Sequence, residues 1–389
     1  MSQEIFVDIG IAIGLFFANP LFWLSILVAI GIGYFRVKKE RRSFNIRMQP
    51  GLTELKNLVS ETWGYAIILS LLISGVGLLV NESYLIVFSI VSMVLLITFN
   101  FKLLSPIYVA ILSVTILSLL AGFQPDFVVK NISFGTFDKF GTLMVTTTVI
   151  TGLLVIIEGS LIKRYGEKGI SSFLIRTKRG LEAGVFKSKK LWLMPTVFLI
   201  PGEMVQSFAP YWPQFTLGET SFTFIVFPII IGFSQVIRTT YPDQLLPQMG
   251  RAIIVIGVVV TAAGVAALWM PILAWAGLAA GGLARIVLSI VTSMRERKTR
   301  YILAPQSRGI VIAGVVPDSP GEKLGLLPGE TIRSVNGRPV HDEKELYDAI
   351  QINAAHCRLQ IIDRYEEVRL LQQVLYHHDH HRLGILVVR

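Results

Sequence analysis

Charged residues are scarce in this sequence. Only 16% of its 389 residues are Asp, Glu, Lys or Arg, whereas 52% are hydrophobic, and the mean hydropathy is +0.61. A soluble domain is usually about one quarter charged, so a chain of this length lacks the charge to coat two or three soluble domains. The composition excludes an ordinary soluble enzyme and a disordered chain, and it indicates a membrane protein.

Histidine, cysteine and aspartate are missing where catalysis or cross-linking would need them. All six histidines lie at or beyond His341, and Cys357 is the single cysteine, so an intramolecular disulfide is excluded. An intramembrane zinc protease needs an HExxH helix, and a serine nucleophile needs a base such as histidine. The apolar segments offer neither, and they hold no aspartate for a catalytic dyad. We therefore expect no catalytic residue, metal site or cofactor.

The basic excess belongs to the apolar part of the chain. Residues 301–389 carry 10 Lys/Arg and 11 Asp/Glu, so the formal net charge of +10 arises within residues 1–300. This division predicts a polytopic membrane domain over 1–294, a basic juxtamembrane linker over 295–304, and a near-neutral soluble domain over 305–389.

Long apolar runs predict an all-α membrane domain, because the hydrocarbon core takes roughly 20 apolar residues per helix and leaves no backbone group unpaired. We expect eight or nine transmembrane helices, the shortest being marginal. Pro20 can divide the first run into an interfacial piece and a span. The candidate spans are 11–34, 63–80, 84–101, 104–121, 143–162, 191–209, 221–237, 251–268 and 270–292.

Lysine and arginine in the short loops predict the orientation. Most of them fall in the stretches 36–62, 163–190 and 295–300, which lie on one side if there are nine spans and an external N-terminus. The C-terminal domain is then cytoplasmic, and we expect the protein in the cell membrane. The first ten residues have no basic stretch, which favours a retained first span over a cleaved signal peptide. Basic loops 36–62 and 163–190 fit attraction to an anionic inner leaflet or a partner surface, and no nucleic-acid module is recognisable in either.

Besides Lys102 near a boundary, three ionisable residues lie inside the candidate spans. They are Glu158, near the cytoplasmic end of its span, Glu203, near the outer end of its span, and Arg285. Such residues are candidates for function because burying a charge in the bilayer is costly. Two interpretations stay open. They have interfacial or packing roles, or they belong to a transport or proton-relay pathway.

Beyond Arg308 the sequence predicts a small α+β domain with regularly spaced turns. Asp342 is the expected N-cap of its longer helix, and Asn336-Gly337 the expected tight turn. Strands are expected at 309–316, 331–335, 357–362 and 367–375, and helices at 321–326 and 341–350. The run GIVIAGVVPDSPGEKLGLLPGETIRSVNGRPV resembles a bacterial PDZ domain. That resemblance implies a module that adds an extended peptide to a sheet edge beside a helix.

The PDZ resemblance also implies where a peptide would bind. Little sequence precedes Gly309, so the carboxylate-binding loop and its strand resemble the segment 382–388, as in a circularly permuted bacterial PDZ domain. The expected groove residues are Arg382, Leu383, Gly384, Ile385, Leu346 and Ile350. The alternative is that the leucines are core residues and that the last segment is an ordinary closing strand.

Four histidines cluster at His377-His378-Asp379-His380-His381. Adjacent residues point in different directions, so four ligands converge on one metal ion only through a special turn. A solvated hairpin loop is the favoured interpretation, and we assign this cluster no role.

The start of the chain, GLFFANPLFWLSILVAIGIGYFRVKKERRSF, resembles the first span and basic exit of the MinJ family, cell-division topological determinants of Gram-positive rods. The most specific part runs from Gly33 to Phe44. The resemblance implies a non-catalytic adaptor at septa and poles that links the scaffold DivIVA to the MinD ATPase and restricts FtsZ ring assembly. It gives no contact residues and no oligomeric state. Two alternatives are a transporter or permease with a regulatory PDZ domain, and a PDZ regulator of a membrane protease.

Overall fold

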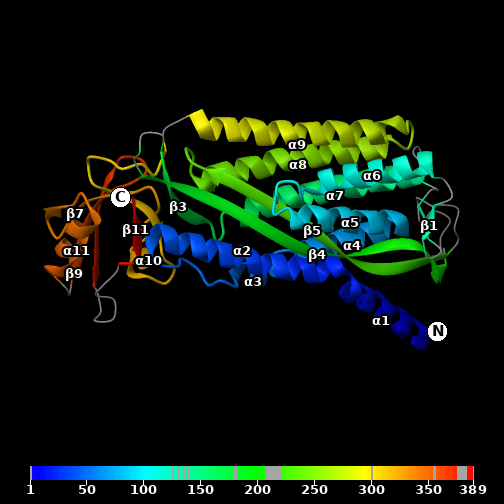
Figure 1. Ribbon diagram of the computed structural model, residues 1–389, viewed down its shortest axis with the longest axis horizontal. Helices are drawn as coiled ribbons and strands as arrows, with labels where there is room; N and C mark the ends of the chain where they lie inside the picture. Colours follow the sequence, from blue (N-terminus) through cyan, green and yellow to red (C-terminus); the bar gives the residue numbers. More distant parts are fainter. Residues whose placement is uncertain are drawn as a thin grey trace.

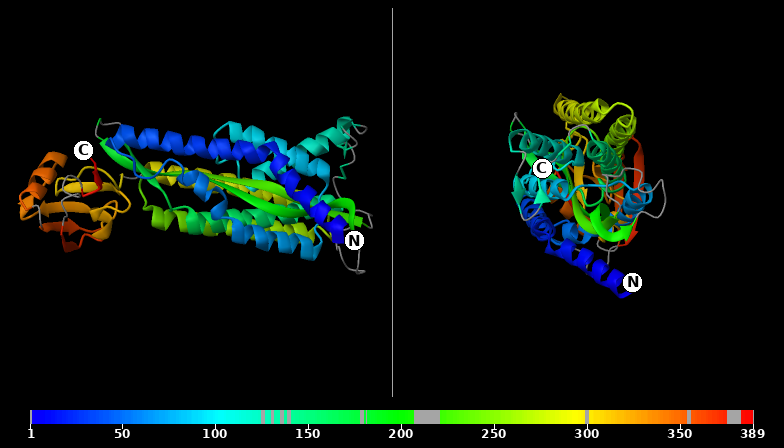
Figure 2. Two further views of the ribbon diagram at one scale, coloured as in Figure 1. Left: turned by 90° about the horizontal axis from the view of Figure 1, so that it is seen from below. Right: turned by 90° about the vertical axis from the view of Figure 1, so that its right-hand side faces the viewer.

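The protein is an elongated helical body with a small C-terminal lobe at one end and the N-terminus at the other (Figures 1 and 2). We call the two ends of the body the lobe end and the distal end. The computed structural model describes residues 2–124, 127–129, 132–134, 137–138, 141–177, 180, 182–206, 221–298, 301–353, 356–374 and 383–388.

The first apolar run is divided in two at Pro20, as predicted. Helix α1 (Ser2–Ala18) ends before Asn19, and α2 (Pro20–Phe44) starts with proline at its first position, where the missing N–H costs nothing. The Asn19 side chain accepts a hydrogen bond from the backbone N–H of Leu21 at 3.0 Å, which caps the second helix. The other helices of the body are α3 (Thr53–Ser60), α4 (Trp63–Val76), α5 (Glu82–Ile97), α6 (Pro106–Phe123), α7 (Thr142–Tyr165), α8 (Pro242–Ala266) and α9 (Ile272–Lys298).

Six helical segments are long and apolar enough to cross a membrane: α2, α3 with α4, α6, α7, α8 and α9. Helix α5 is apolar but has only 16 residues. These segments identify a membrane protein. The predicted number of eight or nine transmembrane helices is not reached in the described residues.

The prediction of an all-α membrane domain is wrong, because two of the candidate spans form β-strands over residues 191–206 and 221–237. They belong to β4 (Glu182–Gln206) and β5 (Ser221–Ile237), two long antiparallel strands. The shorter β3 (Ser171–Arg176) pairs with the lobe end of β4, and the sheet order is β3-β4-β5. Figure 2 shows helices around this sheet in the view along the body. Near the distal end, β1 (Val128–Val129) pairs with β2 (Ile132–Ser133).

Prolines inside the two long strands disfavour a helix there. A proline in a helix interior removes a hydrogen bond and clashes with the preceding turn, at a cost of about 3 kcal/mol. Pro195 and Pro228 are register partners in β4 and β5. Leu193 and Val197, two residues either side of Pro195, direct their backbone groups away from β5 toward helix side chains. Pro195 shares that direction and so removes no hydrogen bond from the strand pair.

Strand β4 carries backbone groups that need partners away from β5, because unpaired groups in an apolar environment are costly. The Thr62 hydroxyl donates to the carbonyl oxygen of Leu193 at 2.6 Å. The N–H of Val197 donates to the Ser70 hydroxyl at 2.9 Å, and the N–H of Val80 donates to the carbonyl of Leu199 at 2.9 Å. Residues in and beside α4 thus supply hydrogen-bond partners for the backbone groups at this edge of β4.

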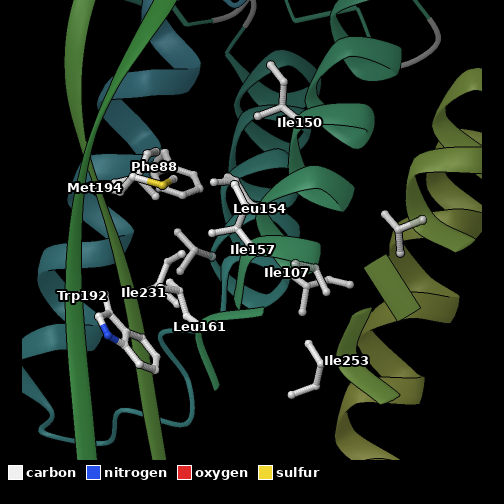
Figure 3. Close-up of a cluster of buried hydrophobic side chains, with 14 of the residues drawn as sticks. Phe88, Ile107, Ile150, Leu154, Ile157, Leu161, Trp192, Met194, Ile231 and Ile253 are labelled. Carbon is white, nitrogen blue, oxygen red and sulfur yellow. The ribbon is translucent and has the colours of Figure 1, made fainter. Parts of the chain in front are cut away.

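The main core lies between the sheet and α7. Side chains from β4 and β5, including Trp192 and Ile231, face Leu154 and Leu161 of α7, with Phe88 of α5 beside Met194 (Figure 3). The same cluster continues past α7 to Ile107 and Ile253, on α6 and α8. Helix α7 is therefore the central helix, and 83% of its 18-residue apolar stretch is buried.

Glycines allow α7 and α8 to approach closely. A Cβ atom at Gly159 would lie 2.6 Å from the carbonyl oxygen of Gly250, and one at Gly250 would lie 2.6 Å from that of Gly159. One heptad along α8, a Cβ at Gly257 would lie 2.6 Å from the backbone nitrogen of Ile156. Small residues at such contacts let helices pack in a membrane, where van der Waals contact and hydrogen bonds hold them together.

The C-terminal lobe has the α+β elements predicted for residues 309–375. The Asp342 side chain accepts from the N–H of Glu345 at 2.7 Å and caps α11, as expected. Asn336 and Gly337 both have positive φ (49° and 83°), which fits the predicted hairpin turn. The elements are β6 (Ile310–Val315), α10 (Pro320–Lys323), β7 (Thr331–Val335), β8 (Arg338–Pro339), α11 (Glu343–Gln351), β9 (His356–Ile362), β10 (Val368–Val374) and β11 (Ile385–Val387). The sheet order is β10-β9-β7-β6-β11, with β8 paired to β7.

Candidate functional site

The C-terminal lobe has a groove along α11. Its inner part, a cavity of about 110 Å³, lies between Glu343 and Tyr347 of α11 and residues 384–387 on and before β11. Its outer part, about 560 Å³, is also lined by Glu343 and Tyr347, together with residues 309–311 and Val388. Strand β11 is the edge strand of the sheet and pairs with β6 on its other side. The lobe thus combines a sheet edge and a helix, the arrangement that accepts an added peptide strand.

The structure brings five of the six predicted groove residues together, while Arg382 lies outside the described residues. Gly384 has φ +71°, a conformation that favours glycine. Leu383, Ile385, Leu346 and Ile350 are all buried in one core cluster, between 2% and 7% exposed. Of these, Gly384 and Ile385 also line the inner cavity. Their role in peptide binding stays a prediction.

Sequence reasoning missed Glu343 and Tyr347 as groove residues. They are four apart and therefore share one face of α11. The apolar stripe of Leu346 and Ile350 faces the core, and the groove is lined by the neighbouring stripe. The sequence signal for these two groove residues was their four-residue spacing, which places Glu343 and Tyr347 together on the helix face beside the apolar stripe.

The lobe packs directly on the helical body. One face of β6 and β11, with Val311, Ala313, Leu386 and Val388, belongs to the main core, against which the partly buried Ile46 and Met48 pack. The segment that leads into the lobe is also tied to the body, because the N–H of Gly184 donates to the carbonyl of Leu303 at 2.7 Å. Residues 44–46, at the end of α2, also line the inner cavity of the groove. The body therefore covers the Gly384 end of the groove.

A polar contact around Arg364 also joins the lobe to the start of α8. Its guanidinium lies 2.8 Å from the Asp243 carboxylate and donates to the carbonyl of Pro328 at 2.9 and 3.1 Å. It also lies 4.1 Å from the centre of the Tyr241 ring, a cation–π contact. Burial raises the pKa of the Tyr241 hydroxyl, although Arg364 acts to lower it.

The predicted basic exit of α2 forms a corner centred on Arg36. Its guanidinium binds Glu54 at 2.5 Å, Glu40 at 2.9 Å and the carbonyl of Pro50 at 2.7 Å. Glu40 is fully buried and also accepts from the Ser171 hydroxyl at 2.6 Å. The corner fixes the turn after α2 and ties it to β3.

A glycine on α2 lets the returning chain lie against the helix. A Cβ atom at Gly33 would lie 1.9 Å from the carbonyl oxygen of Gly51. Any other residue at position 33 would therefore displace the turn that Arg36 holds. Gly33 and Arg36 both lie in the stretch that carried the sequence resemblance.

Two of the three ionisable residues identified inside the candidate spans, Glu158 and Arg285, form an ion pair. Arg285 of α9 lies 2.8 Å from Glu158 of α7, at 5% and 0% side-chain exposure. The Ser105 hydroxyl donates to the other oxygen of Glu158 at 2.5 Å. Glu203 is in β4, but its side chain lies outside the described residues.

The described residues contain no cluster of three or more His, Cys, Asp and Glu that could hold a metal ion. The cluster His377–His381 lies outside them. Cys357 is fully buried in the lobe, and burial raises the pKa of its thiol to about 11.

Comparison with known proteins gives matches at two scales, one domain and the whole chain. A family model of the PDZ domain matches residues 311–363, which confirms the identity of the C-terminal lobe. The cell division topological determinant MinJ of Bacillus subtilis is 30% identical over 390 aligned residues, covering all of this chain and 97% of that protein. The chain belongs to the MinJ family. A probable MinJ of Lacticaseibacillus paracasei is 25% identical over 244 residues, or 61% of this chain and 64% of that one.

The MinJ family assignment covers the body and the lobe together, whereas the other similarities cover the lobe alone. The magnetosome formation protease MamE of Magnetospirillum gryphiswaldense is 35% identical over 66 residues, which is 17% of this chain and 8% of that protease. A match of that length corresponds to a shared PDZ domain. It therefore adds nothing about the body.

Proposed function

We propose that the chain is a membrane adaptor for division-site selection that links a DivIVA-like scaffold to a MinD-like ATPase and thereby restricts FtsZ ring assembly. The observation that carries this proposal is the similarity to a cell division topological determinant over all of this chain and 97% of that protein. The fold supports it, because the PDZ domain packs on the helical body instead of hanging from a long linker. A partner bound to the PDZ domain is thus held close to the membrane.

The orientation that we propose places the PDZ domain in the cytoplasm. The basic stretches 36–62, 163–190 and 295–300 flank the lobe ends of α2, α7 and α9, which supports this orientation under the positive-inside rule. Strands β4 and β5 are antiparallel, so the chain runs along the body and back again, as it would in two helices. The side of the membrane predicted for each later loop is therefore unchanged. We accordingly expect enrichment at division septa and cell poles.

The PDZ groove is the proposed docking site for a partner peptide. It fits a circularly permuted domain in which Gly384 ends the carboxylate-binding loop and β11 is the strand that receives the peptide. Glu343 and Tyr347 would face such a peptide from α11. Residues 44–46 would have to yield space at the Gly384 end, because the cavity there is only about 110 Å³.

The proposal is tested by imaging a fluorescently tagged full-length chain in its own cells, alongside deletion of its gene. We expect fluorescence at septa and poles, and misplaced division sites after deletion. Uniform membrane fluorescence together with normal division sites would refute the adaptor function. A tagged Gly33→Leu variant, designed to disrupt the α2 corner, is the control for loss of the fold. Its abundance is compared with that of the wild type, because a folding defect should lower abundance whereas loss of partner binding alone should not.

A further inference from the structure

The exposed face of α2 changes from apolar to basic along one line of residues. Trp23, Leu27, Ile30 and Tyr34 are exposed by 39–65% and are spaced three or four residues apart, so they share one helix face. Lys38 and Arg41 continue the same face with the same spacing. At 1.5 Å per residue, the apolar part spans about 16 Å, close to one leaflet of a hydrocarbon core about 30 Å thick.

The turn after α2 converts the basic end of this face into a cavity. A hollow of about 620 Å³ lies between the helix and the turn. Its basic lining consists of Lys38, Arg41 and Arg42 from α2 and Arg47 from the turn, and its apolar lining includes Tyr34 and Leu52. Leu52 is 61% exposed and adds apolar surface to this lining.

The cations of this cavity have no acidic partner within it. No carboxylate lines the cavity. The two nearby carboxylates of the corner, Glu40 and Glu54, both bind Arg36, which points to the other side of the turn. Four formal positive charges thus face one hollow beside an apolar surface.

We propose that this cavity binds the phosphate headgroup of an anionic glycerophospholipid from the leaflet on the lobe side of the membrane. The phosphate oxygens would accept from Arg41, Arg42 and Arg47, since guanidinium groups match phosphate geometry. The acyl chains would lie along Tyr34, Ile30 and Leu27. A soluble phosphate would contact the basic residues only, whereas a lipid would also cover the continuous apolar face. The arrangement therefore favours a lipid as the ligand.

The inference does not depend on the proposed function in division. It also gives Arg36 and Gly33 a positioning role, because they hold the turn that closes the cavity. Lipid held there would attach α2 to the membrane surface close to the PDZ groove, whose inner cavity is lined by the end of the same helix.

The test is native mass spectrometry of the full-length protein released from detergent micelles with phosphatidylglycerol or phosphatidylcholine. We expect the first phosphatidylglycerol to bind the wild type more tightly than the first phosphatidylcholine. Each hydrogen bond from a guanidinium group to the phosphate contributes about tenfold or more in affinity, so R41Q/R42Q should weaken phosphatidylglycerol binding about 100-fold or more. Both residues are exposed, and the thermal unfolding of this variant should match the wild type.

The matched control is R295Q/R297Q, which removes the same charge from exposed positions at the lobe end of α9. This variant should keep the wild-type preference. Equal weakening in both variants would overturn the proposal, because it would show an effect of net charge alone. Competition by glycerol 3-phosphate at the same concentrations as the lipid would also overturn it, since the site would then be one for a soluble phosphate.

Discussion

Removing one partner of the Glu158–Arg285 pair is expected to destabilise the helical body strongly. The pair joins the central helix α7 to α9, and both side chains are almost completely buried. Ser105, just before α6, binds the same carboxylate, so three parts of the body meet at this point. In Arg285→Met the Glu158 carboxylate keeps the Ser105 hydroxyl but loses its countercharge. In Glu158→Gln the Arg285 guanidinium is left without one.

The expected size of the effect follows from the burial of the pair. Breaking a buried ion pair by removing one partner costs about 3–5 kcal/mol, because the remaining charge is buried and uncompensated. Replacing both partners removes both charges, and such replacements are often close to neutral. The double variant Glu158→Gln/Arg285→Met should therefore recover most of the loss in the free energy of unfolding.

Equilibrium unfolding of the purified protein in mixed detergent micelles measures these three free energies. If both single variants lose less than about 1 kcal/mol, as an exposed pair would, the structural interpretation of the pair is refuted. A double variant that is as stable as the wild type but mislocalised in cells would show instead that the charges serve function. That outcome would contradict a purely packing role for the pair.

Three further predictions concern the sheet edge and the PDZ domain. Thr62→Val leaves the Leu193 carbonyl without its donor and should lower the free energy of unfolding by about 1–3 kcal/mol in the same assay; an unchanged value would contradict the proposed edge contact. Arg364→Ala removes the ion pair and the cation–π contact at the interface and should speed hydrogen exchange in β11 about fivefold; unchanged exchange would show that apolar contacts alone hold the lobe. Cys357 should resist alkylation at pH 8 in the folded protein and react once it is unfolded, because its thiol stays protonated up to a pKa of about 11; rapid labelling of the folded protein would contradict its burial.

The PDZ domain could be predicted from sequence because its signals are local. Asn336-Gly337 and the Asp342 cap act within a few residues of the backbone that they shape. The division of the first apolar run at Pro20 is local as well. The groove was predicted less completely, since Leu346 and Ile350 lie in the core and the cavity is lined by Glu343 and Tyr347. Which of two adjacent helix faces meets the sheet edge depends on packing.

The long strands could not be separated from spanning helices by apolar length alone. Pro195 and Pro228 were the local signs against a helix. The strand also depends on tertiary contacts, because Thr62 and Ser70, from another part of the chain, supply hydrogen bonds to its backbone edge. The ion pair of Glu158 and Arg285 likewise joins residues 127 positions apart, and sequence reasoning identified both residues without pairing them.

The position of the MinD-like ATPase in living cells tests the adaptor function most directly. A fluorescent fusion of that ATPase is imaged in cells with and without this chain, at equal ATPase abundance. The account predicts that the ATPase gathers at septa and poles when the chain is present and spreads along the membrane when it is absent. An ATPase that keeps its septal and polar positions without the chain would contradict the account.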